Sequence, residues 1–166
     1  MPTPGLDVLP ATIDDLDAYE AAFGQREYFA ERCTRQKNDR GVLLIARFDG
    51  RPVGDVYLSF DKADEMEVRE ALPGVPLIFH LEVLPAHRRR GYGTALMTRA
   101  ERVARDLGHR RVALGVQVAN IAARRLYDTL AYREWNRPPI ALDHRTGERL
   151  PDHEVYTILT KDLPLI

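Results

Sequence analysis

Residues 77–94 read LIFHLEVLPAHRRRGYGT and hold the strongest structural signal in the chain. The apolar run 77–84 predicts a strand. Two glycines, Gly91 and Gly93, then precede a stretch with helical apolar spacing over residues 94–107. Strand, glycine turn and helix in this order favour an anion site, because free backbone N–H groups and the helix dipole converge at such a turn.

The composition of this turn narrows the kind of anion. Arginines at 88–90 can add charge-assisted hydrogen bonds to phosphate oxygens. The turn lacks the Gly-Lys-Ser/Thr ending of a P-loop and the third glycine of a dinucleotide fingerprint. We therefore expect a phosphate-bearing ligand, with neither Mg-ATP nor NAD favoured. Taken alone, a Gly-x-Gly turn is also compatible with a purely structural role.

The chain before this segment predicts strands followed by helices. Thr12, with Asp15 three residues later, resembles a variant capping box for a helix. Asp49-Gly50 predicts a hairpin turn between two apolar runs. The expected elements are a strand at 6–9, a helix after Thr12, a helix or loop at 25–40, hairpin strands at 42–48 and 53–60, and an acidic helix within 61–72.

The chain after this segment alternates strands and helices. The nearly all-apolar run 112–118 predicts a strand buried on both faces. Asn120 can cap a further helix, and strands are expected near 132–136 and 154–160. Because a strand meander is followed by βαβ units, the fold class is α/β, with a mixed sheet flanked by helices.

Length and composition restrict the class of protein. The chain has 166 residues, and this length predicts a single domain over 1–166. No run approaches the roughly 18 apolar residues of a membrane span, and the N-terminus shows no signal-peptide pattern. Cys33 is the only cysteine, so no disulfide is expected. A lone cysteine fits a reducing compartment, and we therefore expect a cytoplasmic location. The net charge of −1 points to neither nucleic acid nor membrane as a partner.

Charge is nevertheless distributed unevenly along the chain. Residues 87–111 hold eight arginines and two acids, whereas residues 55–82 hold seven acids and two cations. Such asymmetry can orient an anionic ligand on one side and a cationic one on the other. The acids of 61–70 could attract a cationic acceptor, or they could simply form a polar surface.

Two motifs together identify a family resemblance. Residues 83–93, VLPAHRRRGYG, resemble the pyrophosphate motif Q/R-x-x-G-x-G/A of the GNAT superfamily of acyl-CoA-dependent N-acyltransferases. Residues 120–132, NIAARRLYDTLAY, resemble the downstream CoA and general-acid segment of that family. Their order and separation match the family, although Ala131 stands where glycine is common. Because alanine resists the left-handed cap that glycine takes, this helix is expected to end differently.

The resemblance implies a fold and a cofactor site. The sheet would be mostly antiparallel, with six to seven strands, and would splay between its fourth and fifth strands, 77–84 and 112–118, to receive the acyl group. Acetyl-CoA would be the cosubstrate, and no metal is expected. The implied CoA-binding residues are Leu81 and Val83 through their main chain, the loop residues Arg88, Arg89, Arg90, Gly91, Tyr92, Gly93 and Thr94, and the side chain of Asn120.

The resemblance also implies a reaction, the transfer of an acetyl group to a primary amine. Tyr127 would be the general acid for the departing thiolate. An amine of pKa about 10.4 is mostly protonated at neutral pH, so a base is useful. His80 and Glu82, two residues apart on one strand, are the candidates, with a water chain or a base elsewhere as the remaining alternatives.

Each candidate also has a structural interpretation. Tyr127 could be a core residue, Asn120 a simple helix cap, and the two base candidates ordinary polar partners. A non-catalytic acyl-CoA-binding module is the main functional alternative, and nucleic-acid binding is disfavoured. The acceptor, a small-molecule or peptide amine, is not identified by the sequence. A homodimer is expected from the habit of the family alone.

Overall fold

The computed structural model describes residues 3–164, which form one seven-stranded sheet in the order β1-β2-β3-β4-β5-β7-β6. Neighbouring strands are antiparallel except β4 and β5, which are parallel. The strands are β1 (Leu6–Pro10), β2 (Gly41–Phe48), β3 (Arg51–Ser59), β4 (Leu77–Val83), β5 (Arg111–Gln117), β6 (Arg133–Glu134) and β7 (Tyr156–Asp162). The predicted mixed sheet flanked by helices is therefore confirmed.

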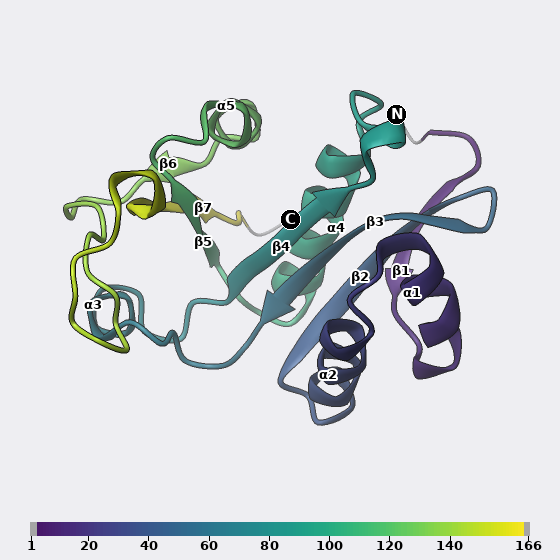
Figure 1. Cartoon of the computed structure of the whole chain (residues 1–166), viewed down its shortest axis with the longest axis horizontal. Helices are drawn as coiled ribbons and strands as arrows, with labels where there is room; N and C mark the ends of the chain where they lie inside the picture. The colour runs from purple at the N-terminus through teal and green to yellow at the C-terminus, as the bar shows by residue number, and fades with distance from the viewer. Residues whose placement is uncertain (1–2, 165–166) are drawn as a thin grey trace.

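Helices cover both faces of this sheet. Figure 1 shows α1 and α2 in front of the N-terminal strands and α4 behind them. None of the helices between residues 3 and 164 is long and apolar enough to cross a membrane. The α-helices are α1 (Leu16–Phe23), α2 (Arg26–Lys37), α3 (Met66–Ala71), α4 (Tyr92–Asp106) and α5 (Ile121–Thr129), and the single-turn 3-10 helices are η1 (Ile13–Asp15), η2 (Pro85–His87) and η3 (Asp152–Glu154).

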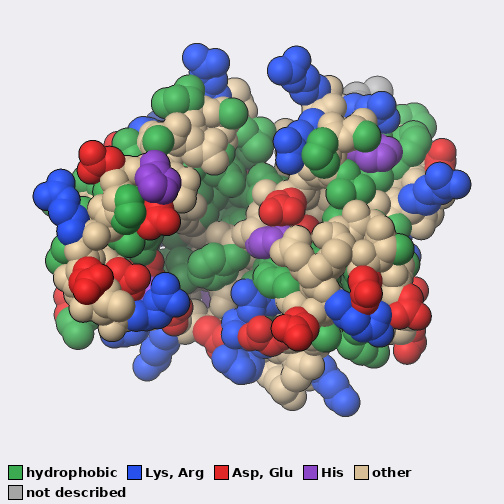
Figure 2. Space-filling view, in the orientation of Figure 1, with side chains coloured by type: hydrophobic (Ala, Val, Ile, Leu, Met, Phe, Trp, Pro, Cys, Tyr) green, Lys and Arg blue, Asp and Glu red, His purple; other side chains and the backbone are tan. Residues whose placement is uncertain are grey.

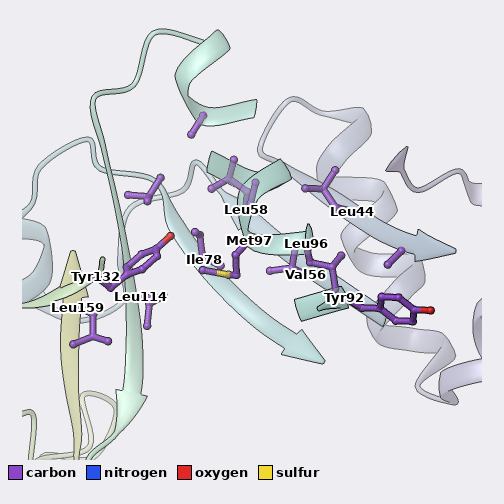
Figure 3. Close-up of a cluster of buried hydrophobic side chains, with 14 of the residues drawn as sticks. Leu44, Val56, Leu58, Ile78, Tyr92, Leu96, Met97, Leu114, Tyr132 and Leu159 are labelled. Atoms are coloured by element: carbon purple, nitrogen blue, oxygen red, sulfur yellow. The ribbon is translucent and has the colours of Figure 1, made fainter. Parts of the chain in front are cut away.

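The main core lies between the sheet and α4. Leu96, Met97 and Ala100 of α4 are fully buried against side chains from β2, β3, β4 and β5, as Figure 3 shows for part of this cluster. On the other face, Tyr19 and Phe29 from α1 and α2 pack on alternate residues of β2 and β3. The alternation of apolar residues along these strands thus supplies both cores.

The parallel pair opens into a fork. β4 and β5 pair only at Leu77↔Ala113 and Ile78↔Leu114, although each strand has seven residues. Beyond Ile78 the two strands diverge, as Figure 1 shows. The splay expected between the fourth and fifth strands is present, and it leaves unpaired backbone on the later residues of β4.

Most predicted elements are present, with shorter or shifted limits. The hairpin turn at Asp49-Gly50 joins β2 to β3, and the ambiguous region 25–40 contains a helix. Thr12 is the N-cap residue of η1, as predicted, but the capping-box hydrogen bonds are absent, because its hydroxyl donates to the Asp15 carboxylate and bonds to no helix N–H. That carboxylate also accepts a hydrogen bond from Arg47, which lowers its pKa.

The C-terminus of α5 corrects a further expectation. Ala131 adopts the left-handed conformation, with φ +68°, in the position where alanine was expected to prevent it. Its N–H donates to Asp128 and the N–H of Tyr132 donates to Tyr127, which is the Schellman pattern. The same pattern ends α4, where Gly108 has φ +92°. Burial of Tyr132, which is 4% exposed, favours this turn in spite of the alanine.

The C-terminal turns of α5 and α4 predict that two reciprocal substitutions, one in each turn, have opposite effects on the free energy of unfolding. Ala131→Gly should raise the free energy of unfolding by about 0.5–1 kcal/mol, because glycine takes the left-handed conformation without steric cost. Gly108→Ala should lower it by about 1 kcal/mol for the same reason. Urea denaturation of both variants measures the two changes. A loss of stability in Ala131→Gly would contradict the strain assigned to Ala131.

Candidate active site

A β-bulge in β4 decides which side chains meet at the fork. Glu82 pairs with Asp55 and Phe79 with Tyr57, so two residues of β4 lie opposite Val56 alone. The extra residue is accommodated at His80, whose φ of +60° lies in the left-handed region. Phe79 and His80, although adjacent in sequence, consequently lie on the same face of the sheet as Tyr57.

The other side chains of this strand point the opposite way. Ile78, Leu81 and Val83 pack on the cluster under α4. The imidazole of His80 lies 3.7 Å from the Glu82 carboxylate, so the two base candidates share a face of the sheet. The bulge thus adds Phe79 to the face that carries both base candidates.

Asp55 of β3 anchors His80. The Nδ1 atom of His80 lies 2.9 Å from Oδ2 of Asp55, and the Asp55 side chain is fully buried. In the tautomer in which Nδ1–H donates to this carboxylate, Nε2 carries the lone pair and can accept a proton, after which it can donate to the nearby Gln25 amide oxygen. Among the residues described, no side chain or backbone group bonds to Oδ1 of Asp55.

Residues from the start of α2 complete the surroundings of His80. The Tyr28 ring stacks on the imidazole with 4.2 Å between centroids, and the Gln25 amide oxygen lies 3.3 Å from Nε2. Gln25 itself has φ +54°. Left-handed non-glycine residues at both Gln25 and His80 are the kind of backbone strain that often accompanies function.

The electrostatics of the pair favour a protonatable imidazole. The hydrogen bond to Asp55 raises the pKa of His80, and the charges of Asp55 and Glu82 act in the same direction, against burial. Burial raises the pKa of Asp55, and His80 opposes that rise. Because His80 is only half-buried and faces two carboxylates, its pKa lies above the ordinary histidine value. His80 is therefore a stronger base than a free histidine.

Asp55, His80 and Glu82 could also present one ligand atom each to a cation. Their candidate ligand atoms lie within 4.8 Å of one another. His80 already shares Nδ1 with Asp55, and a carboxylate–histidine pair of this kind serves a base as readily as a metal.

A cavity of about 290 Å³ opens next to this cluster, at the fork. Figure 2 shows a hollow in this face of the molecule, with acidic and histidine side chains at its rim. Phe79, which is 45% exposed, lines the cavity beside His80. The other apolar lining residues are Val68, Leu77, Leu114 and Ile158. A larger cavity, near Trp135 and Lys161, shares no lining residue with this one.

The glycine turn lies at the N-terminus of α4. Gly91 is the N-cap with φ +81°, and Arg89 also has positive φ, so the backbone curls tightly there. A Cβ atom at Gly93 would meet the protein only at ordinary contact distances, 3.7 Å or more. The fold alone therefore does not require glycine at this position, whereas a ligand lying against the turn would. This space fits a phosphate group on the backbone N–H groups.

The other predicted cofactor residues are placed in several ways. The side chains of Arg88, Arg89, Arg90 and Thr94 are exposed around the turn, and the Nε of Arg88 donates to the carbonyl of Val83. The Tyr92 side chain is 2% exposed in the core, so only its backbone is available. The Oδ1 atom of Asn120 caps α5 by accepting from Ala123, as the helix-cap interpretation predicted.

Tyr127 lies on the α4 side of the sheet. It packs against the main core and makes an edge contact with Tyr132, with 5.9 Å between centroids. Burial raises the pKa of the Tyr127 hydroxyl, so it stays protonated at neutral pH and is able to donate. Tyr132 is fixed in turn by a hydrogen bond to the buried Glu101, which also binds Lys161.

Sequence reasoning missed three residues of this site: Asp55, Gln25 and Tyr28. Asp55 carried a usable signal, because a single carboxylate inside an apolar strand is rarely buried without a partner. Gln25 and Tyr28 carried none, since they reach His80 only through the packing of α2 on the sheet.

Comparison with known proteins agrees with this geometry. Residues 9–132 match the model of the Acetyltransferase (GNAT) family, which is well over half of the chain. The chain belongs to this family. The match includes both the glycine turn and the segment that contains Tyr127.

Curated GNAT relatives are similar over part of their length. An uncharacterised N-acetyltransferase of Methanocaldococcus jannaschii is 35% identical over 98 residues, which are 59% of this chain and 42% of that protein. One of Mycobacterium tuberculosis is 33% identical over 105 residues, 63% of this chain and 59% of that protein. The chain thus matches less than two thirds of either relative.

Solved GNAT structures share the whole fold. The PaiA N-acetyltransferase of Thermoplasma acidophilum, in complex with coenzyme A, has a TM-score of 0.68 at 14% identity, covering 95% of this chain and 98% of that one. The YncA protein of Salmonella typhimurium, solved with acetyl-CoA, has a TM-score of 0.68 at 19% identity, covering 96% of this chain and 95% of that one. The ribosomal-protein-S18-alanine N-acetyltransferase of Escherichia coli has a TM-score of 0.67 at 19% identity, covering 97% of this chain and 96% of that one.

The anchoring of His80 predicts a measurable pKa change. In the native protein the imidazole should titrate above the ordinary histidine value of about 6.5. Asp55→Asn removes the charged acceptor and should lower the pKa of His80. NMR titration of the imidazole measures both. Glu82→Gln is the control, and its effect should be smaller, because Glu82 lies farther from the ring. An unchanged pKa in Asp55→Asn would contradict this assignment.

Proposed function

We propose that the protein is an N-acetyltransferase that moves an acetyl group from acetyl-CoA to a primary amine. The proposal is carried by the fork between β4 and β5, which separates two sets of groups. His80 with its partners lies on the face of α2, whereas Tyr127 packs on the face of α4. A thioester in the fork would have a base on one side and an acid on the other.

Acetyl-CoA supplies the activated acyl group, and this chain supplies a place for its phosphates and its arm. The backbone N–H groups from Arg88 to Thr94 would bind the pyrophosphate, and the exposed arginines would add charge. Leu81 and Val83 lie on the part of β4 that β5 does not pair, and their main chain would bind the pantetheine arm as an added strand does. Asn120 would contribute its Nδ2 group, since its oxygen already caps α5.

His80 is the base that we propose from the two sequence candidates. Its Nε2 would take a proton from the acceptor amine, while Asp55 holds Nδ1 and stabilises the imidazolium that forms. Glu82 is about half exposed, so it lacks the burial that a carboxylate would need to act as a base near neutral pH. Its proposed role is to lie beside the imidazole and attract the cationic amine.

Tyr127 is the proposed acid. Its buried hydroxyl stays protonated, and a proton donated from it would neutralise the leaving thiolate. The hydrogen bond that Tyr132 donates to Glu101 holds the Tyr132 ring, and the edge contact of that ring with Tyr127 would position the Tyr127 side chain.

The remaining proposals follow from the same residues. The chain would act as one catalytic domain over 1–166, without a metal, on a small-molecule or peptide amine, with no nucleic-acid or membrane partner. Cys33 is buried and unpaired, which supports a cytoplasmic location.

Gly93 provides a test of the CoA site. Gly93→Ala should leave the free energy of unfolding unchanged or slightly raised, since the protein has room for a Cβ. It should weaken acetyl-CoA binding about tenfold or more, because a methyl group would occupy the space of the phosphates. Calorimetry with acetyl-CoA, and with CoA and ADP as comparators, measures this. If Gly93→Ala binds acetyl-CoA as tightly as the native protein does, the glycine turn is not part of the CoA site.

Substitutions on the two faces test the mechanism. Tyr127→Phe should lower kcat about 10-fold to 100-fold with acetyl-CoA affinity nearly unchanged, and His80→Asn should lower kcat by about 100-fold or more. Thiol release with a panel of amines measures both.

The native rate should rise with pH through the raised pKa of His80, because only the neutral imidazole accepts a proton.

Two outcomes would contradict parts of this mechanism. Full activity of either variant would exclude that residue from the chemistry. Tight acetyl-CoA binding without transfer to any amine would instead support the alternative, a non-catalytic acyl-CoA-binding module. EDTA should leave the rate unchanged, since the His80 cluster is proposed to work without a cation.

A further inference from the structure

The cavity at the fork has a charge pattern that bears on the acceptor. Two of its lining residues, Glu65 and Glu154, are carboxylates, and none is Lys, Arg or His. His153 lies 3.9 Å from Glu154 but does not line the cavity. The lining thus carries two carboxylates, Glu65 and Glu154, and one amide, Gln117, and its other side chains are aliphatic or aromatic.

Tyr156 connects one of these carboxylates, Glu65, to the rest of the cavity wall. Its hydroxyl donates a hydrogen bond to Glu65, and its ring lines the cavity. Burial raises the pKa of this hydroxyl most, followed by its hydrogen bond to Glu65 and by the charges of Glu65, Glu67 and Asp143. Several carboxylates therefore surround Tyr156, whose ring lines the cavity.

The other end of the cavity adjoins the base. Phe79 lines the cavity, and the bulge places His80, the next residue, on the same face. The structure therefore presents a base with two nearby carboxylates and, next to it, a cavity with an apolar wall of Phe79, Leu77 and Leu114 and a second pair of carboxylates. A volume of about 290 Å³ suits a small molecule.

We infer that the acceptor is a small amine with two cationic ends separated by an apolar chain. One end would be the amine acetylated beside His80, and the other would lie between Glu154 and Glu65 near Tyr156. This inference rests on the proposed function and names its substrate class. Of the acids in the segment 61–70, Glu65 lines this cavity.

Three probes of matched length separate charge from apolar contact. Hexamethylenediamine carries a distal cation, hexylamine a distal methyl group and aminohexanoate a distal anion. Calorimetry in the presence of CoA measures binding, and thiol release from acetyl-CoA measures transfer. We expect the diamine to bind about tenfold more tightly than hexylamine, and aminohexanoate to bind most weakly.

A matched pair of variants locates the effect. Glu154→Gln should weaken diamine binding several-fold and leave hexylamine binding unchanged. Glu70→Gln, on the same α3 segment as the cavity wall but outside the lining, should change neither.

The two possible failures are distinguishable. Equal binding of the diamine and hexylamine, or equal loss for both in Glu154→Gln, would overturn the dicationic acceptor while leaving amine acetylation intact. Preferential diamine binding without transfer of acetyl to any amine would uphold the charge preference of the cavity, and would show that the proposed transferase reaction is wrong.

Discussion

The hydrogen bond between His80 and the buried Asp55 holds the bulge of β4, and the proposed active site depends on that bulge. Without the extra residue, Phe79 and His80 would lie on opposite faces of the sheet. With it, the base candidate and the wall of the cavity share a face, while Leu81 and Val83 turn to the α4 side. The left-handed backbone at His80 has a steric cost, and the Asp55 bond and the Tyr28 ring offset it.

The same distortion is connected to the opening of the sheet. β4 keeps its pairing with β3 on both sides of the bulge, but it pairs with β5 at only two positions. One side of the fork is therefore β4, which is held by its pairing with β3. The other side is β5, which is held by its pairing with β7. Helices α4 and α5 support the side proposed for the cofactor, and α2 and α3 border the side proposed for the acceptor. The two faces thus allow an acid and a base to approach one reacting centre from opposite sides.

Local patterns were sufficient for most of the fold. The hairpin at Asp49-Gly50, the glycine turn before α4 and the cap at Asn120 are decided by residues close in sequence, and each has the predicted conformation. The left-handed Ala131 was not predictable in this way. Intrinsic preference opposes it, whereas burial of the following Tyr132 in the core favours it. The capping-box bonds predicted at Thr12 are absent for a similar reason, because the Asp15 carboxylate also binds Arg47 from a distant strand.

For the site, the sequence by itself determined the glycine turn, the family resemblance and the two base candidates on one strand, because these depend on residue types at short spacing. Only the tertiary structure decided which side chains surround His80. Asp55, Gln25 and Tyr28 come from β3 and the start of α2, and packing of α2 on the sheet brings them together. The acidic cavity likewise joins α3, β4, β5 and β7, and no spacing along the chain records that meeting of distant segments.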